Sequence, residues 1–388
     1  MEAEKVTRNE DNMDKVCRNR NDDKCVTSGS GEWNIPLVDA HVHVLSEGRY
    51  TSMIESMRQS GCECMTLLSL FYPLGVDTKR VAEIFAGMQR GQTQNDMMLE
   101  YKRADPDRFY VFGALDYGFD EYERLLSADC GSLAERLGEQ PLKLKAIGCD
   151  GIKLIESKPL LRRFYPWPLD GDVYAKFFAN AEKKRMPIMW HVGDPASFWD
   201  ATKEQPEFVE EGDMLYTRPG DPQLEDLQQE AIRVLERHPN LTVIFAHFFF
   251  IDDELGRARA LLDDYPNMYL DTTQHWEMYV NFNAQREGAR EFFMDFQDRI
   301  VFGSDNVFGN YRDGIWSDEF AARNHQFMKQ YFSSDDTMPD DFPPLAMKGF
   351  APPGTVIRGL DLPDNVLRKF YHANFERIAG KRPAPLPE

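Results

Sequence analysis

The sequence is poor in cysteine, has no long apolar run and has no excess of basic residues. Its 388 residues include 6 cysteines, all before residue 150, without the paired C-x-x-C motifs that hold structural zinc. Reduced thiols, as in a cytoplasmic protein, are therefore expected. The longest apolar stretch, Ile244–Ile251, is interrupted by His247 and is far shorter than the roughly 20 residues of a membrane-spanning helix. The N-terminal segment is polar, so we expect no secretory signal.

The charge balance of the chain is strongly acidic. Asp and Glu number 65 against 45 Lys and Arg, which gives a net charge of −20 and a pI near 4.9. Such a surface repels phosphate backbones and anionic lipid, which argues against nucleic acid and membranes as partners. Hydrophobic residues make up 42% of the chain and charged residues 28%, values typical of a soluble enzyme with a large core.

The first 32 residues differ in composition from the rest of the chain. They mix Asn, Asp, Lys, Arg, Ser and Gly with almost no apolar periodicity, so they cannot bury enough surface to offset the entropy of ordering. We expect a flexible tail over residues 1–32 and a single domain over residues 33–388.

After the tail, short β-rich apolar runs alternate with segments of helical period. Eight strands are predicted, at Leu37–Val44, Met65–Leu70, Phe109–Leu115, Gly151–Ile155, Pro187–Val192, Leu241–Phe249, Met268–Thr273 and Ile300–Ser304. Repeated strand–helix alternation predicts an α/β fold, most simply a closed (β/α)₈ TIM barrel. A doubly wound open sheet is the alternative. It would normally carry a glycine-rich loop after the first strand, and this sequence has none there.

Two connections are too long to be simple loops. Gly193–Pro222 follows the fifth predicted strand, and Val307–Leu362 follows the eighth. In a barrel both would lie at the C-terminal face, where active sites are built. Each is expected to form a lid or pocket wall, with a passive surface excursion as the alternative.

Polar side chains that can bind metal fall at the ends of several predicted strands. His41 and His43 are two apart on the first strand, so they share a face. His191 ends the fifth strand, His247 lies late in the sixth, and Asp305 follows the eighth. The strand ends of a barrel converge on one mouth, and three His with one Asp suit Zn²⁺ or a similar ion. Independent strand-end residues with local hydrogen bonds are the alternative interpretation.

These motifs resemble the amidohydrolase superfamily, and most closely the amidohydrolase-related family of metal-dependent hydrolases, lactonases, decarboxylases and hydratases. The resemblance rests on D-x-H-x-H at Asp39–His43, the strand-five His191, Ala246-His247 on strand six and Gly303-Ser304-Asp305 on strand eight. Asp105–Phe109 and His372–Arg377 agree with it, and it covers roughly residues 37–379.

The resemblance implies one divalent metal, most simply Zn²⁺, with Mn²⁺, Fe²⁺ or Co²⁺ as alternatives. It makes His41, His43, His191 and Asp305 the metal ligands. His247 would be the catalytic histidine, and Asp305 would accept a proton from the metal-activated water. Dimers are common in such families, so a homodimer is possible.

Other residues are candidates for contact with substrate. Lys153, on the fourth strand, could bridge two metals or face the pocket as a cation, and we favour the second with a single ion. His275 follows strand seven and could contact substrate or be a hydrogen-bonded structural histidine. Arg162 and Arg218 lie on loops after strands four and five and could bind a carboxylate, although loop arginines are usually solvated. His238 and His325 lie on predicted helices and are expected at the surface.

One further departure from the family pattern concerns the segment after the strand-six histidine. Members often carry glycine there, whereas this chain has His247-Phe248-Phe249-Phe250, which leaves the local pocket shape open.

The function predicted from the sequence is a cytoplasmic, metal-dependent hydrolase of a small molecule, which could carry a carboxylate. A metal-dependent decarboxylase or hydratase using the same site is the first alternative. A histidinol-phosphatase-like barrel also begins with H-x-H but normally carries more ligands, and a non-catalytic metal-binding protein is the remaining alternative.

Overall fold

The structure is a computed structural model, and it describes residues 35–203, 205, 209, 213–275, 277–309, 317–342 and 351–387. The tail expected over residues 1–32 lies outside the described residues, as does part of the long connection after strand eight. Among the described residues, no helix is both long and apolar enough to cross a membrane. Cys62, Cys64, Cys130 and Cys149 are free thiols, as expected.

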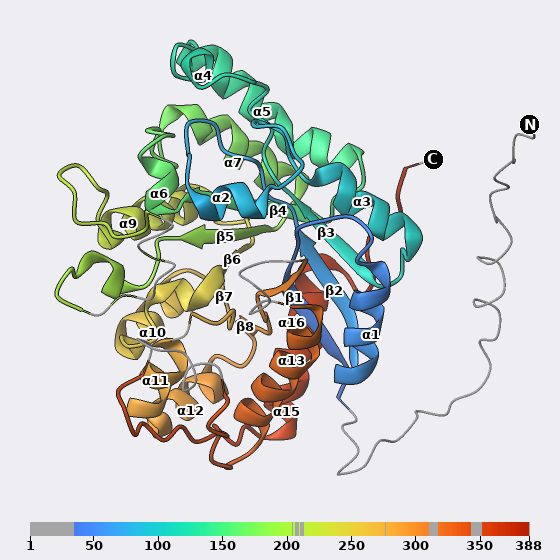
Figure 1. The fold of residues 1–388 in the computed structure, drawn as a ribbon, viewed down its shortest axis with the longest axis vertical. Helices are drawn as coiled ribbons and strands as arrows, with labels where there is room; N and C mark the ends of the chain where they lie inside the picture. Colours follow the sequence, from blue (N-terminus) through green and yellow to red (C-terminus); the bar gives the residue numbers. More distant parts are fainter. Residues whose placement is uncertain are drawn as a thin grey trace, which may run out of the picture. The chain divides into compact units, whose positions relative to one another are not determined.

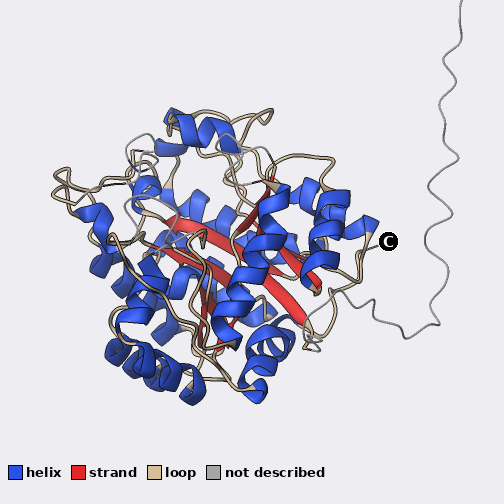
Figure 2. Ribbon diagram, turned by 60° about the horizontal axis from the view of Figure 1, so that its bottom comes forward, coloured by secondary structure: helices blue, strands red, loops and turns tan. Residues whose placement is uncertain are grey.

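Nine parallel strands form one curved sheet in the order β8-β7-β6-β5-β4-β3-β2-β1-β9, with helices packed around it (Figures 1 and 2). The strands are β1 (Leu37–Val44), β2 (Cys62–Leu68), β3 (Phe109–Gly113), β4 (Gly151–Ser157), β5 (Ile188–Val192), β6 (Val243–Phe245), β7 (Met268–Asp271), β8 (Ile300–Val301) and β9 (Asn306–Phe308).

Only the first part of the eighth predicted strand, Ile300–Ser304, forms β8, and a further short strand, β9, follows it and helps to close the barrel. β8 pairs with β7, and β9 pairs with β1. Between them, the Ala40 N–H donates to the Phe302 carbonyl at 2.9 Å, and the Asp305 N–H donates to the His41 carbonyl at 3.0 Å. The predicted TIM barrel is confirmed, with its seam between the first and eighth strands.

The helices follow the strands in the expected alternation. They are α1 (Tyr50–Ser60), α2 (Lys79–Ile84), α3 (Asn95–Ala104), α4 (Tyr122–Leu126), α5 (Cys130–Ala146), α6 (Pro159–Arg162), α7 (Asp172–Lys184), η1 (Ala196–Trp199), α9 (Leu224–Arg237), η2 (Ala246–Phe250), α10 (Leu255–Asp264), α11 (Glu277–Ala284), α12 (Arg286–Asp295), α13 (Asp318–Ser333), α15 (Asp364–Arg368), η4 (Lys369–Ala373) and α16 (Asn374–Ala379). Helix α13, which lies inside the long connection after strand eight, is the helix that carries His325.

The sixth strand is shorter than the sequence pattern predicts. It ends at Phe245 because His247, Phe248, Phe249 and Phe250 all have left-handed backbone conformations, with φ between 53° and 58°. For residues other than glycine, this conformation costs roughly 1–2 kcal/mol per residue. The three Phe side chains are buried, and that burial offsets the strain.

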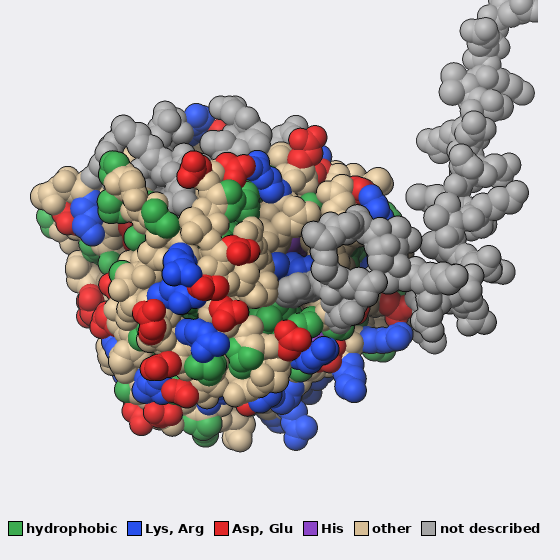
Figure 3. All heavy atoms as spheres, turned by 90° about the horizontal axis from the view of Figure 1, so that it is seen from below, with side chains coloured by type: hydrophobic (Ala, Val, Ile, Leu, Met, Phe, Trp, Pro, Cys, Tyr) green, Lys and Arg blue, Asp and Glu red, His purple; other side chains and the backbone are tan. Residues whose placement is uncertain are grey.

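The core of the barrel is built from apolar side chains of β1, β2, β3, β5, β6 and β8, together with α16. Its buried members are Val38, Ala40, Leu68, Tyr110, Phe112, Met189, Ile244, Ala246, Val301 and Phe375. On the face of the molecule shown in Figure 3, acidic and basic side chains are interspersed.

Candidate metal centre and active site

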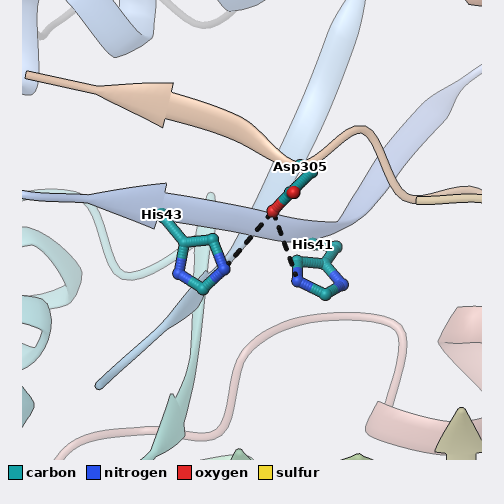
Figure 4. A group of neighbouring side chains, drawn as sticks. All are labelled: His41, His43 and Asp305. Atoms are coloured by element: carbon teal, nitrogen blue, oxygen red, sulfur yellow. Dashed lines mark ion pairs between the residues drawn. The ribbon is translucent and has the colours of Figure 1, made fainter. Parts of the chain in front are cut away.

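Three side chains from β1 and the β8–β9 connection converge on one point (Figure 4). Nε2 of His41 lies 3.6 Å from Oδ1 of Asp305, and Nε2 of His43 lies 3.4 Å from the same oxygen. Two ligands of one tetrahedral ion, each about 2.1 Å from it, lie about 3.4 Å apart. The spacing of these donor atoms therefore fits a single divalent ion, and the three residues are a possible metal-binding group.

Hydrogen bonds on the far side of each ring fix which nitrogen faces Asp305. Nδ1 of His41 lies 2.8 Å from Oδ2 of Asp271, and Nδ1 of His43 lies 3.3 Å from the Leu68 carbonyl. A carboxylate and a carbonyl can only accept, so both Nδ1 atoms carry the proton and both Nε2 atoms present a lone pair. Three lone-pair donors thus face one another, an arrangement that a cation stabilises.

The backbone of the strand-eight motif explains why it contains glycine. A Cβ placed on Gly303 would lie 2.6 Å from Oγ1 of Thr273 and 3.0 Å from Cβ of His41. Asp305 itself has φ +56°, a left-handed conformation that is uncommon for residues other than glycine. The close approach of Gly303 to His41 and the left-handed turn together aim the Asp305 carboxylate at the two histidines.

His191 and His247 form a second pair beside this group. Nδ1 of His191 lies 3.1 Å from Nε2 of His247, and Nε2 of His191 lies 3.0 Å from Nζ of Lys158. The His41 and His247 rings are 5.7 Å apart. The structure brings His191 next to the three-residue group but not into it. Nδ1 of His247 is buried and has no hydrogen-bond partner within the described part of the chain.

Burial sets the protonation of these histidines. Desolvation and the charge of Lys153 lower the pKa of His41 well below 6.5, and desolvation lowers the pKa of His43, His191 and His247 in the same way. The neutral imidazole is the form that binds metal, so all four are in the ligating state at pH 7. Desolvation lowers the pKa of Lys153 to about 8. The Nζ atom of Lys153 lies 3.2 Å from Nε2 of His41.

A cavity of about 230 Å³ opens onto this group. Its polar lining includes His43, Lys153, His191, His247 and Asp305. Apolar side chains form the rest of its wall, among them Val81, Ile84, Phe85, Leu160, Leu161, Phe198, Met214 and Phe250. A cavity with a polar floor and apolar walls suits a small organic molecule.

The family model described as amidohydrolase matches residues 38–378, which is most of the chain. The chain belongs to the amidohydrolase family. The predicted family is therefore confirmed, and an enzyme of this superfamily is the function class that follows. No curated protein matches the chain.

Several solved structures are similar to this amidohydrolase. An uncharacterised TIM-barrel protein from Bordetella bronchiseptica is 15% identical, with 89% of this chain and 99% of that chain covered and a TM-score of 0.50. A 2,6-dihydroxybenzoate decarboxylase from Rhizobium is 16% identical, with 89% and 98% covered and a TM-score of 0.48. A 4-oxalomesaconate hydratase from Rhodopseudomonas palustris is 12% identical, with 89% and 96% covered and a TM-score of 0.46. The first of these, with a TM-score of 0.50 and 15% identity, shows the fold and not the reaction.

Two cations in the amidohydrolase pocket were missed by the sequence analysis. Lys158 lies just after β4, with Nζ 2.5 Å from Oδ1 of Asp194, whose other oxygen accepts a 2.6 Å hydrogen bond from the Tyr216 hydroxyl. Arg80 of α2 also lines the cavity. Lys158 could have been found, because it follows a strand end as Lys153 does. Arg80 lies far from any predicted strand end.

The arginines predicted to bind substrate lie elsewhere. Arg162 makes a bidentate ion pair with Glu230, at 2.5 and 3.1 Å, and Arg218 pairs with Asp213 at the surface. Neither is among the residues that line the cavity. His275 does line it, and its Nε2 lies 2.5 Å from Oδ1 of Asp252.

The surface position expected for His325 is wrong. Its side chain is fully buried, with Nε2 2.7 Å from Oδ2 of the buried Asp39. His238 is half-buried, and its Nδ1 lies 3.1 Å from Glu182. Asp271 was also missed as a site residue, although a buried Asp at the end of β7 follows the same pattern as the other strand-end ligands.

Proposed function

We propose that this amidohydrolase is a metal-dependent hydrolase of a small organic molecule. The observation that carries the proposal is the convergence of three lone-pair donors, His41 Nε2, His43 Nε2 and Asp305 Oδ1, at the spacing of metal ligands. His41, His43 and Asp305 would hold the ion, with His191 as the predicted fourth ligand. A divalent ion held there, most simply Zn²⁺, would supply Lewis acidity to the reaction.

The chain's own residues supply orientation and proton transfer. Asp271 holds the His41 ring and also accepts a 2.8 Å hydrogen bond from the backbone N–H of His247. One carboxylate therefore positions both histidines. His247 lines the cavity, and we assign to its side chain the exchange of a proton with substrate.

The cavity lining favours an amphipathic substrate. Lys153, Lys158 and Arg80 lie in one cavity with the carboxylates of Asp194 and Asp305, in a protein whose net charge is −20. An added divalent ion would make this interior strongly positive, so an anionic group on the substrate is attracted to it. The apolar wall would cover the remainder of the molecule.

A non-oxidative decarboxylase is the second candidate, and the same cations favour it. Lys158 and Lys153 could hold a substrate carboxylate near His247, which would then deliver a proton to carbon as CO₂ leaves. The two candidates differ in their products.

The experiment is a product assay of the zinc-loaded protein against esters, lactones, amides and aryl or alkenyl carboxylates. Release of an acid from an ester, lactone or amide supports hydrolysis, and CO₂ release supports decarboxylation. Both activities must disappear in His43→Ala. Bound zinc without turnover of any compound would instead support a non-catalytic metal-binding protein.

A further inference from the structure

A network of buried polar side chains lies behind the metal ligands, outside the cavity. Its centre is Asp39, whose side chain is fully buried. Oδ1 of Asp39 accepts hydrogen bonds from the His41 N–H at 3.1 Å and the Ser304 N–H at 3.0 Å. Oδ2 accepts one from the Ser304 hydroxyl at 2.5 Å and lies 2.7 Å from Nε2 of His325.

These contacts tie together the two segments that carry the ligands. His41 follows Asp39 by two residues on β1, and Asp305 follows Ser304 directly in the β8–β9 connection. On a regular strand Asp39 would share the face of His41 and His43. The pairing of β1 with β2 changes register between Asp39 and Val42, and Asp39 instead meets α13.

His325 anchors this carboxylate from helix α13. Its Nδ1 lies 3.1 Å from Oγ of Ser60, at the end of α1, so both ring nitrogens have a partner. The neighbouring Asn324 donates to the Ser304 carbonyl at 3.2 Å and to Oδ1 of Asn306 at 2.9 Å. Helix α13, which packs beside α1 (Figure 1), therefore contacts both sides of the barrel seam.

We propose that His325 is a positioning residue, which acts through Asp39 and Ser304 to hold His41 and Asp305 at the spacing of metal ligands. The proposal rests on the proposed metal site. It assigns a role in metal binding to a helix of the strand-eight insertion that contributes no ligand itself. Groups behind metal ligands typically change metal affinity by 10–100-fold when removed.

Two variants that differ by one methylene separate this role from simple packing. His325→Gln carries an amide N–H near the position of Nε2 and can still reach Asp39. His325→Asn carries it near Nδ1 and can reach only Ser60. His238→Asn, the same substitution in a histidine–carboxylate pair that does not line the cavity, is the matched control.

The measurement is the Zn²⁺ dissociation constant by competition with a chromophoric chelator, on full-length protein whose fold is checked by circular dichroism. We expect His325→Asn to bind Zn²⁺ at least about 10-fold more weakly than wild type, and His325→Gln and His238→Asn to stay within about 3-fold. Equal zinc affinity of folded His325→Asn and wild type overturns the proposal, and so does an equal loss in His325→Gln and His325→Asn.

Ser304→Ala covers the case in which His325→Asn does not fold. It deletes a second donor to Oδ2 of Asp39 and should also weaken zinc binding, so unchanged affinity in this variant contradicts the proposal. A wild-type protein that binds no zinc would refute the metal site itself. Unchanged affinity in the variants, with zinc bound to wild type, refutes only the role of His325.

Discussion

Nδ1 of His41 lies 2.8 Å from Oδ2 of Asp271, and both side chains are buried. The other oxygen of Asp271 accepts hydrogen bonds from the N–H groups of His247 and Thr273. One carboxylate at the end of β7 thus sets the tautomer of a predicted metal ligand and the position of the predicted catalytic histidine. Asp271 sets this tautomer and this position without contacting the ion.

Asp271→Asn should weaken metal binding by 10–100-fold, because an amide can donate to His41 Nδ1 and so favour the wrong tautomer. The zinc dissociation constant of the folded variant measures the effect. Zinc binding as tight as in wild type would show that the ring orientation does not depend on this carboxylate.

Gly303→Ala should weaken metal binding and destabilise the protein by about 1–3 kcal/mol, because the new Cβ would lie 2.6 Å from Thr273 Oγ1 and 3.0 Å from His41 Cβ. Urea unfolding and zinc titration report the two effects. Gly256→Ala is a control, since nothing lies within 4 Å of its added Cβ. If Gly303→Ala had the same stability and zinc affinity as wild type, the backbone between β8 and β9 would have to shift without cost to make room for the new Cβ.

Lys158→Met should weaken the binding of an anionic probe. Lys158 lines the cavity, whereas the exposed Arg218 does not. We expect the dissociation constant of benzoate, measured by calorimetry on zinc-loaded protein, to rise about 10-fold in Lys158→Met through loss of one charge-assisted hydrogen bond. Arg218→Met should leave it unchanged. The reverse pattern would restore Arg218 as the anion-binding residue.

Glu156→Gln should change how stability depends on pH. Burial raises the pKa of Glu156 from its ordinary 4.5 to about 7, although the hydroxyl of Tyr117 and the charge of Lys153 oppose the increase. The folded protein therefore holds this proton more tightly than the unfolded chain. The resulting stability is present below pH 4.5 and is lost as the pH rises through 7.

In Glu156→Gln this loss is absent. Relative to wild type, the free energy of unfolding of the variant should thus increase by about 2 kcal/mol between pH 5 and pH 8. Urea unfolding of both proteins at the two pH values provides the comparison. Parallel pH dependence of the two proteins would contradict the raised pKa.

The part of the site that could be predicted from the sequence is the part fixed by strand geometry. His41 and His43 share one strand, and Asp305 follows another, so the barrel alone brings them together. The convergence of strand ends at one mouth also brought His247 to the cavity. For the same reason Asp271, at the end of β7, lay within reach of prediction.

Side chains placed by insertions and loops could not be predicted in this way. His325 lies on α13, whose packing against β1 depends on a register shift that no periodicity reveals. Arg162 is held by Glu230, 68 residues further along the chain. The turn after β6 is left-handed, although Phe disfavours this backbone conformation. Burial of the three Phe rings outweighs the backbone strain.

The most direct test of the metal centre is a crystal structure of the zinc-loaded protein with anomalous scattering recorded at the zinc edge. The account predicts one anomalous peak, within about 2.0–2.2 Å of Nε2 of His41, Nε2 of His43 and a carboxylate oxygen of Asp305. An ion elsewhere, or no ion in protein saturated with zinc, would contradict it.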